Sequence, residues 1–157
     1  MTSPGNRDWP ATDPAYRRSE VTAALGAGDA VWARAGADVL GWRVKTASGF
    51  SVDSRGPACP GERVRVTARC FGLGVVEPIE VVAVVRERDR VGFSYRTLPG
   101  HPVSGEEAFI VHRHGGQAYL TVRSITRAAP QQPWRALFPL LRVVQHIVRR
   151  RYLRALL

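Results

Sequence analysis

The sequence lacks several features that would assign it to a protein class at once. Its two cysteines, Cys59 and Cys70, are too few for a disulfide framework, and their spacing matches no zinc template. No apolar run approaches the ~20 residues that cross a bilayer, and the first twenty residues contain no secretory signal. We therefore expect a cytoplasmic protein, and the residues indicate neither a metal site nor a cofactor.

Lysine and C-terminal acid are also scarce. Lys45 is the only lysine among 23 basic residues. Residues 131–157 contain no Asp or Glu and carry +6 of the net charge of +10. Their basic residues are Arg135, Arg142, Arg149, Arg150, Arg151 and Arg154. This charge could serve contact with an anionic membrane or an acidic protein, or it could be an ordinary solvated face.

What is present is typical of a globular protein. The 157 residues suit one domain, and 45% of them are hydrophobic while 23% are charged. Pro4, Gly5, Pro10 and Pro14 break any periodicity near the N-terminus. The pattern predicts a flexible N-terminal leader over residues 1–15 and a single domain over residues 16–157.

Hydrophobic periodicity predicts the elements of that domain. A strand is expected over Ser19–Leu25, and a helix from Asp29 to about Leu40. The clearest strand is Glu62–Phe71, in which apolar and basic residues alternate. The remaining strands are expected at Trp42–Thr46, Phe50–Asp53, Ile79–Arg88, Arg90–Leu98, Glu107–His112 and Gln117–Thr126.

The chain ends in a predicted helix from Pro133 or Trp134 to Leu156. Five apolar residues fall within a sector of about 60° on this helix: Leu137, Leu141, Val144, Val148 and Ala155. Its opposite side carries Arg135, Arg142, His146 and Arg149. A helix of this kind next to so many strands predicts an α+β fold, a curved antiparallel β-sheet of about seven strands gripping the helix. In that fold Val144 is expected to be fully buried.

Several stretches resemble a known family. The segment FSYRTLPGHPVSGEE at 93–107, LGAGDAVWARAGADVLGWRV at 25–44 and the C-terminal run 139–152 resemble the bacterial and plant family called domain of unknown function 1990. That family is similar to the START-like helix-grip superfamily, whose members often enclose an apolar ligand between sheet and helix. The resemblance therefore implies a helix-grip fold, but it implies no particular reaction.

The chain departs from the family pattern at two places. Arg96 stands where the family usually has glycine, and Glu77-Pro78-Ile79-Glu80 stands where it often has an Asn-Pro-Cys-Arg run. A site that depends on the cysteine and arginine of that run would be lost here.

The loop from Leu98 to Glu107 is the main site candidate. It places His101 near Glu106 and Glu107, and a carboxylate beside a histidine can orient it as an acid or base. The alternative is structural, since a glutamate can simply accept backbone N–H bonds of the loop. Glu77 and Glu80 are likewise either cavity carboxylates or a solvated pair at the sheet edge. His112 and His114 share a strand face but lack an evident third metal ligand.

Three functions remain open. The first is binding of a small apolar or amphipathic molecule between sheet and helix, with contacts from Tyr95, Arg96, Glu80, Leu141, Val144, Val148 and Arg151. The second is a cyclase/aromatase- or isomerase-like enzyme using His101 with Glu106 or Glu107. The third is a basic adaptor that docks on acidic lipid or protein through the C-terminal helix. No specific nucleic-acid partner is expected, because aromatic residues are not interleaved with the arginines.

Overall fold

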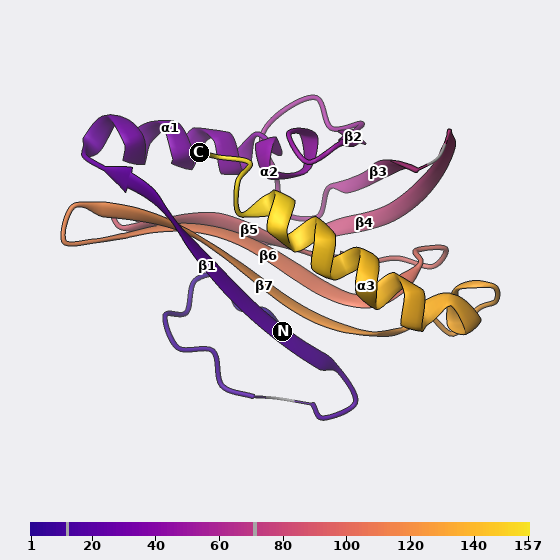
Figure 1. Cartoon of the computed structure of the whole chain (residues 1–157). Helices are drawn as coiled ribbons and strands as arrows, with labels where there is room; N and C mark the ends of the chain where they lie inside the picture. The colour runs from indigo at the N-terminus through magenta and orange to yellow at the C-terminus, as the bar shows by residue number, and fades with distance from the viewer. Residues whose placement is uncertain (12, 71) are drawn as a thin grey trace.

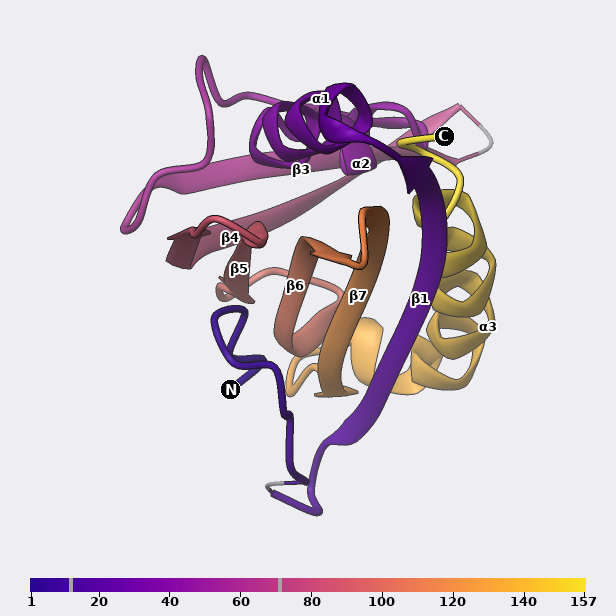
Figure 2. The ribbon, with the colours of Figure 1, turned by 90° about the vertical axis from the view of Figure 1, so that its left-hand side faces the viewer.

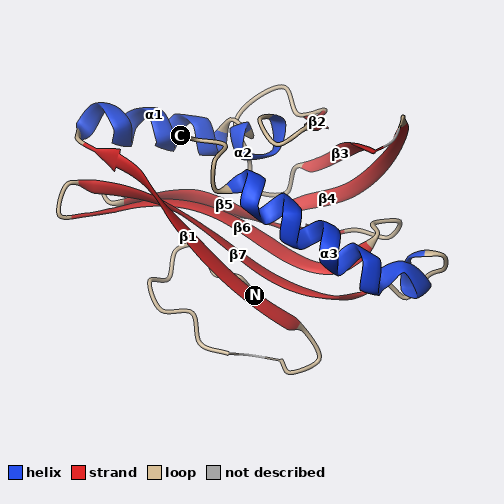
Figure 3. Ribbon diagram, in the orientation of Figure 1, coloured by secondary structure: helices blue, strands red, loops and turns tan. Residues whose placement is uncertain are grey.

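The computed structural model describes the chain from Met1 to Leu157 except Thr12 and Phe71, and the side chain of Cys70 is likewise outside the description. The elements follow in the order β1 (Arg17–Ala27), α1 (Asp29–Leu40), α2 (Arg43–Thr46), β2 (Phe50–Val52), β3 (Arg63–Cys70), β4 (Leu73–Arg86), β5 (Arg90–Thr97), β6 (Val103–His114), β7 (Gln117–Ala128) and α3 (Trp134–Tyr152). The strands form one antiparallel sheet in the order β1-β7-β6-β5-β4-β3-β2 (Figures 1 and 3). The predicted curved sheet with a long C-terminal helix is confirmed.

Strands β2 to β6 each pair with the next strand in sequence, and the last strand, β7, also pairs with the first strand, β1. Gly105 permits a close approach of β6 to β7: a Cβ there would lie 1.8 Å from the carbonyl oxygen of Ile125. Gly115 and Gly116 turn the chain between the same strands with φ values of 56° and 84°. These glycines let β6 and β7 run the length of the sheet and carry side chains to both of its faces.

The concave face carries the main hydrophobic core. Phe93, Phe109 and Leu120 are fully buried there, together with Val39 from α1 and Trp42 from the start of α2. The rings of Trp42 and Phe93 meet edge to face with centroids 4.7 Å apart. Helices α1, α2 and α3 all lie on this side of the sheet (Figure 2).

The prediction of a strand over Trp42–Thr46 is wrong, because the segment forms the short helix α2. Trp42 adopts a left-handed conformation, with φ of 64°, and its carbonyl accepts from the N–H groups of Lys45 and Thr46. In a strand, successive side chains would point to opposite faces. The helical turn instead buries both Val44 and Lys45. Tertiary burial therefore overrides the local strand pattern.

Helix α3 covers the sheet loosely. Tyr152 is its only buried residue among those described, whereas Leu141 and Val148 are half-buried. The expectation that Val144 is fully buried is wrong, since 44% of it is exposed. The inward face of the helix is turned by about 60° toward the arginine side, so that Gln145 and Arg149 also point inward. Within the described chain, no helix has both the length and the apolar character to cross a membrane.

The N-terminal segment Met1–Pro10 lies along the convex face, on the opposite side of the sheet from α3 (Figure 2). Thr2, Pro4 and Trp9 are buried there. The Arg123 guanidinium donates to the carbonyls of Ser3, Asn6 and Arg7 at 3.0, 2.9 and 2.8 Å. Residues 1–10 therefore make packing contacts with the sheet, and the flexible leader expected over residues 1–15 stays a prediction. Proline and glycine prevented a helix or strand, but a nonregular segment can still pack.

Candidate ligand site beneath the C-terminal helix

A cavity of about 300 Å³ lies between the concave face of the sheet and α3. Strands and helix contribute apolar lining residues, namely Phe50, Ala68, Val75, Val103, Trp134, Leu141, Val144 and Val148. The loose contact of α3 with the sheet leaves this space. Its size and largely apolar wall are typical of small-molecule sites in proteins.

Four polar side chains meet at the wall of this cavity: Lys45, Tyr95, Glu107 and Tyr152, hereafter the Lys45 cluster. The Lys45 ammonium lies 2.6 Å from the Tyr152 hydroxyl oxygen and 3.2 Å from a Glu107 carboxylate oxygen. The Tyr95 hydroxyl donates to the same carboxylate oxygen. The cluster joins α2, β5, β6 and α3, which are far apart in sequence.

Burial fixes the chemical state of the two tyrosines. Desolvation, and then the charge of Glu107, raise the pKa of both Tyr95 and Tyr152 well above the usual value. Both therefore keep their hydroxyl protons at neutral pH. Tyr152 accepts a hydrogen bond from Lys45 and so retains its own O–H for donation. Lys45 also lies 4.8 Å from the centroid of the Phe50 ring, which favours a cation.

His101 and Glu77 form a second polar pair in the same cavity. His101 Nδ1 accepts from the backbone N–H of Val103 at 3.0 Å, and its Nε2 lies 3.8 Å from a Glu77 oxygen. Burial, followed by the charge of Lys45, lowers the pKa of His101 to about 3. Burial raises the pKa of Glu77, while Lys45 opposes that shift. His101 is thus a neutral imidazole with its proton on Nε2, and the cavity disfavours charge on Glu77.

The structure places most of the predicted site residues around this cavity. Its lining includes His101, Glu106, Glu107, Tyr95, Leu141, Val144, Val148 and Arg151. It does not bring His101 together with Glu106, however, because that carboxylate accepts from the N–H of Thr2 at 2.8 Å. Glu106 and Glu107 are successive strand residues, so their side chains leave on opposite faces.

Arg96 and Glu80 lie elsewhere. They face each other across β4 and β5 in an ion pair, and Arg63 lies 3.4 Å from the same carboxylate. Neither residue lines the cavity. Of the two alternatives for the Glu77/Glu80 pair, Glu77 takes the cavity position, and Glu80 lies outside the cavity, half-buried and paired with Arg96 and Arg63.

Two functional candidates, Lys45 and Tyr152, escaped the sequence reasoning as site residues. Lys45 falls in a segment predicted to be a strand, and nothing in the pattern singles out Tyr152. Glu77 is one of the two alternatives that the sequence offers for a cavity carboxylate. One signal was available for Lys45, the only lysine in a chain with 22 arginines, a choice that a specific ammonium contact would explain. No pattern in the sequence joins these residues, because each comes from a different element.

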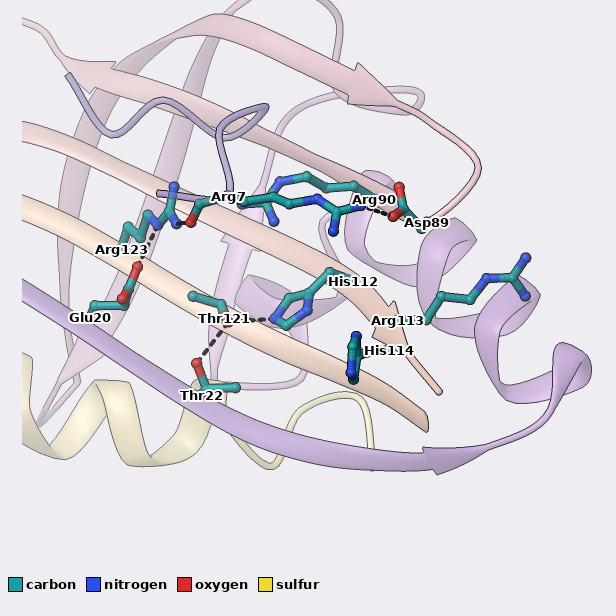
Figure 4. Close-up of a pocket in the computed structure, with 10 residues that line it drawn as sticks. All are labelled: Arg7, Glu20, Thr22, Asp89, Arg90, His112, Arg113, His114, Thr121 and Arg123. Carbon is teal, nitrogen blue, oxygen red and sulfur yellow. Dashed lines mark hydrogen bonds and ion pairs between the residues drawn. The ribbon is translucent and has the colours of Figure 1, made fainter. Parts of the chain in front are cut away.

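A second pocket, of about 360 Å³, lies on the convex face beside the N-terminal segment (Figure 4). There His112 Nε2 is 2.9 Å from the Thr121 hydroxyl, which lies 2.7 Å from the Thr22 hydroxyl. Burial and the charges of Arg90 and Arg123 lower the pKa of His112. His114 lines the same pocket, but the described residues include no group of three or more His, Cys, Asp or Glu placed to hold a metal. Its arginines are engaged with carboxylates and backbone carbonyls, as Figure 4 shows for Arg7 and Arg123.

Solved structures of other proteins share this architecture. A hypothetical protein of Helicobacter pylori superposes with a TM-score of 0.65 at 13% identity, over 99% of this chain and 96% of that one. The ZhuI aromatase/cyclase of Streptomyces sp. R1128 gives a TM-score of 0.61 at 21% identity, over 90% and 91%. A protein of the dynemicin biosynthetic locus, DynU16, gives 0.54 at 23% identity, over 92% and 48%. At these identities the likeness establishes the helix-grip fold alone.

Sequence comparison identifies the family. A UPF0548 protein of Deinococcus radiodurans is 44% identical over 62 residues, which make up 39% of this chain but only 31% of that protein. The profile named Domain of unknown function (DUF1990) matches residues 3–155. The resemblance noted in the sequence is confirmed, and the chain belongs to the DUF1990 family with a START-like, helix-grip fold.

Proposed function

We propose that this protein binds a small amphipathic molecule in the cavity beneath α3. The observation that supports the proposal is the arrangement of the lining: a largely apolar space ends at the Lys45 cluster. The apolar body of the ligand would contact Leu141, Val148 and the concave face. Its polar end would receive hydrogen bonds from Lys45 and Tyr152.

The donors in the cluster define the polar end of the ligand. An ammonium has three N–H donors, and Lys45 directs two of its contacts to Tyr152 and Glu107. Tyr152 keeps a hydroxyl proton because its pKa is raised. Both groups suit an oxygen acceptor such as a carbonyl or a carboxylate. A ligand that carries only donors would leave these groups unpaired.

Binding can be tested with anilinonaphthalene sulfonate, an amphipathic fluorescent anion, together with native mass spectrometry of freshly purified protein. Leu141 lines the cavity, whereas its neighbour Leu140 is exposed on α3 and does not. We expect Leu141→Trp to fill the cavity and to weaken the dye at least about tenfold, as expected when a ligand's apolar site is occupied. Leu140→Trp should bind like the wild type. Equal affinity for all three proteins, or equal loss in both variants, would contradict the proposal.

A second test concerns the polar end. In Lys45→Met/Glu107→Gln both charges are removed together, so no unpaired buried charge remains. We expect this variant to unfold within about 1 kcal/mol of the wild type, yet to bind the dye at least about tenfold more weakly. If the variant binds the dye as tightly as the wild type, the anionic group of the dye does not bind at the Lys45 cluster.

Two carboxyl groups in the cavity, Glu77 and Glu107, favour a second candidate function, which is proton transfer at a carbon next to a carbonyl group. Glu77, with its raised pKa, can hold a proton, while Glu107 is paired with Lys45. Two carboxyl groups in unlike surroundings suit acid and base roles. His101 suits such a role poorly at neutral pH, because it takes up a proton only near pH 3. The aromatase/cyclase among the structural neighbours makes this chemistry compatible with the fold.

This candidate predicts exchange of α-protons in enolisable ketones dissolved in deuterium oxide, followed by NMR. We expect exchange that depends on the protein and that Glu77→Gln and Glu107→Gln abolish while dye binding persists. Glu62→Gln, outside the cavity, is the control. If no ketone in a panel of cyclic and long-chain compounds exchanges above the buffer rate, the protein only binds its ligand.

A further inference from the structure

Helix α3 carries an exposed apolar stripe, of which Val144 alone also lines the ligand cavity. It consists of Leu137, Leu140, Val143, Val144 and Ile147, and is called the α3 stripe below. Leu140, Val143 and Ile147 are 60%, 58% and 49% exposed. Their spacing of three and four residues places them on one side of the helix. Five large apolar side chains within three turns exceed the isolated apolar residues that a protein surface normally exposes.

Arginine borders this stripe along one side and at its end. At about 100° per residue, Arg150 lies about 20° beyond Val143, and Arg151 lies one turn after Ile147, whereas Arg142 lies about 100° beyond Val143 on the polar side of the helix. All three are exposed. Within residues 131–157 there is no acidic side chain to neutralise them. An apolar strip flanked by uncompensated cations is complementary to an anionic lipid surface, in which acyl chains lie beneath negative headgroups.

The stripe also adjoins the mouth of the cavity. Val144 is 44% exposed and at the same time lines the cavity, so it belongs to both surfaces. Leu141 and Arg151 line the cavity on either side of it along the helix. A bilayer that contacts the stripe would thus lie against the opening through which an amphipathic molecule enters.

We propose that α3 docks on anionic membranes through the α3 stripe and its flanking arginines, lying parallel to the surface. The helix meets the requirements of an interfacial helix: it is amphipathic, its polar side is basic, and it is too polar to insert across the bilayer. The apolar residues would enter the headgroup region while Arg150 and Arg151 contact lipid phosphates. This proposal concerns the outer side of α3 and holds whether or not the cavity contains a ligand.

The test is flotation of the full chain with vesicles of pure phosphatidylcholine or of phosphatidylcholine mixed with phosphatidylglycerol. We expect binding to the anionic vesicles to be at least about tenfold tighter, and to weaken as salt is raised. Hydrogen exchange of the wild-type protein should show new protection in α3 on these vesicles, and not in β3 and β4.

Matched variants separate the stripe from general charge. Arg142→Gln/Arg150→Gln and Arg86→Gln/Arg88→Gln each remove two exposed arginines and leave the same net charge. We expect only the α3 pair to lower vesicle affinity markedly. Leu140→Gln/Ile147→Gln should lower it at least about tenfold, while Val82→Gln, an exposed valine on β4, should not.

Three results would overturn the proposal. One is equal binding to neutral and anionic vesicles, or no binding to either. Another is an equal loss in the two arginine pairs, which would mean attraction by net charge alone. The third is a wild-type dimer that Leu140→Gln/Ile147→Gln converts to a monomer, which would make the stripe an interface between copies of this chain. Dye binding in the cavity should survive in every variant of the stripe, so failure here is distinguishable from failure of the ligand site.

Discussion

Lys45 and Arg123 are buried cations on opposite faces of the same sheet, and they are satisfied in different ways. On the convex face, Arg123 donates to the backbone carbonyls of Thr2, Ser3, Asn6 and Arg7 and pairs with Glu20. On the concave face, the Lys45 ammonium contacts the polar side chains of Tyr152 and Glu107 and borders a cavity. The first arrangement uses up its donors in holding the chain together.

The difference distinguishes polar groups that hold the fold together from polar groups that line a cavity. A guanidinium with five donors and several fixed carbonyls forms a closed network, which leaves nothing to offer a ligand. The Lys45 cluster lines a cavity, so its ammonium and hydroxyl groups border a space that no described side chain fills. Three predictions challenge or sharpen this comparison.

The largest effect is expected at Arg123. Arg123→Met would leave Glu20 and the carbonyls of the N-terminal segment without their partner, and we expect a loss of about 3–5 kcal/mol in unfolding free energy. Urea unfolding followed by tryptophan fluorescence measures it. The exposed Arg127, whose guanidinium lies over the Tyr16 ring, supplies the control Arg127→Met. A loss below about 1 kcal/mol at Arg123 would show that the N-terminal segment is only weakly attached.

The next effect is a pH dependence from His101. Its pKa is about 3 in the folded protein, against about 6.5 for an unperturbed histidine. Because the unfolded chain takes up the proton first, stability falls as pH drops below 6.5. From these two pKa values we expect a loss of about 2.5 kcal/mol between pH 6 and pH 4. His101→Gln retains an acceptor for Val103 and should flatten this part of the profile, whereas His146→Gln on the exposed side of α3 should leave it unchanged.

Glu77 modifies the same profile in the opposite direction. Its pKa is raised in the folded protein, so the folded state holds its proton more tightly than the unfolded chain does. Its contribution to stability therefore declines as pH rises above 4.5, toward the raised value. Comparison of slopes in the His101→Gln and His101→Gln/Glu77→Gln proteins separates the two groups. A His101→Gln profile as steep as that of the wild type would exclude histidine as the source.

The smallest effect is expected at Val144 and tests how loosely α3 covers the concave face. Val144 is exposed at the cavity mouth, so Val144→Asp should cost less than about 1 kcal/mol. Val148, one turn further on, packs against the core cluster, and Val148→Asp should cost about 2–4 kcal/mol because its charge would enter apolar surroundings. Thermal melts of both variants provide the comparison. Equal and large losses would mean that α3 closes on the sheet in solution.

The expected strands illustrate how far local pattern reaches. The alternation of Glu62–Phe71 predicted β3 to within a residue at its start, because one face of that strand is buried and the other is wet. The prediction of a strand over Trp42–Thr46 was wrong, because the choice between helix and strand over five residues depends on what buries Val44 and Lys45. On α3 the apolar sector was located correctly, but the side that faces the sheet was not. A helix with more apolar surface than the sheet can cover has no unique inward face in its sequence.

The residues of the site likewise fall into those that local sequence could place and those that it could not. His101, Glu107 and Tyr95 could be placed near one another because they lie on one hairpin, where sequence distance limits spatial distance. Lys45 and Tyr152 are 107 residues apart, and the contact between them exists only because the sheet curves beneath α3. By itself the sequence determined the order of the elements, the antiparallel sheet and the long basic helix, since these follow from local periodicity and charge. Only the tertiary structure decided which polar groups meet in the cavity and which side of α3 stays exposed, because both depend on long-range packing.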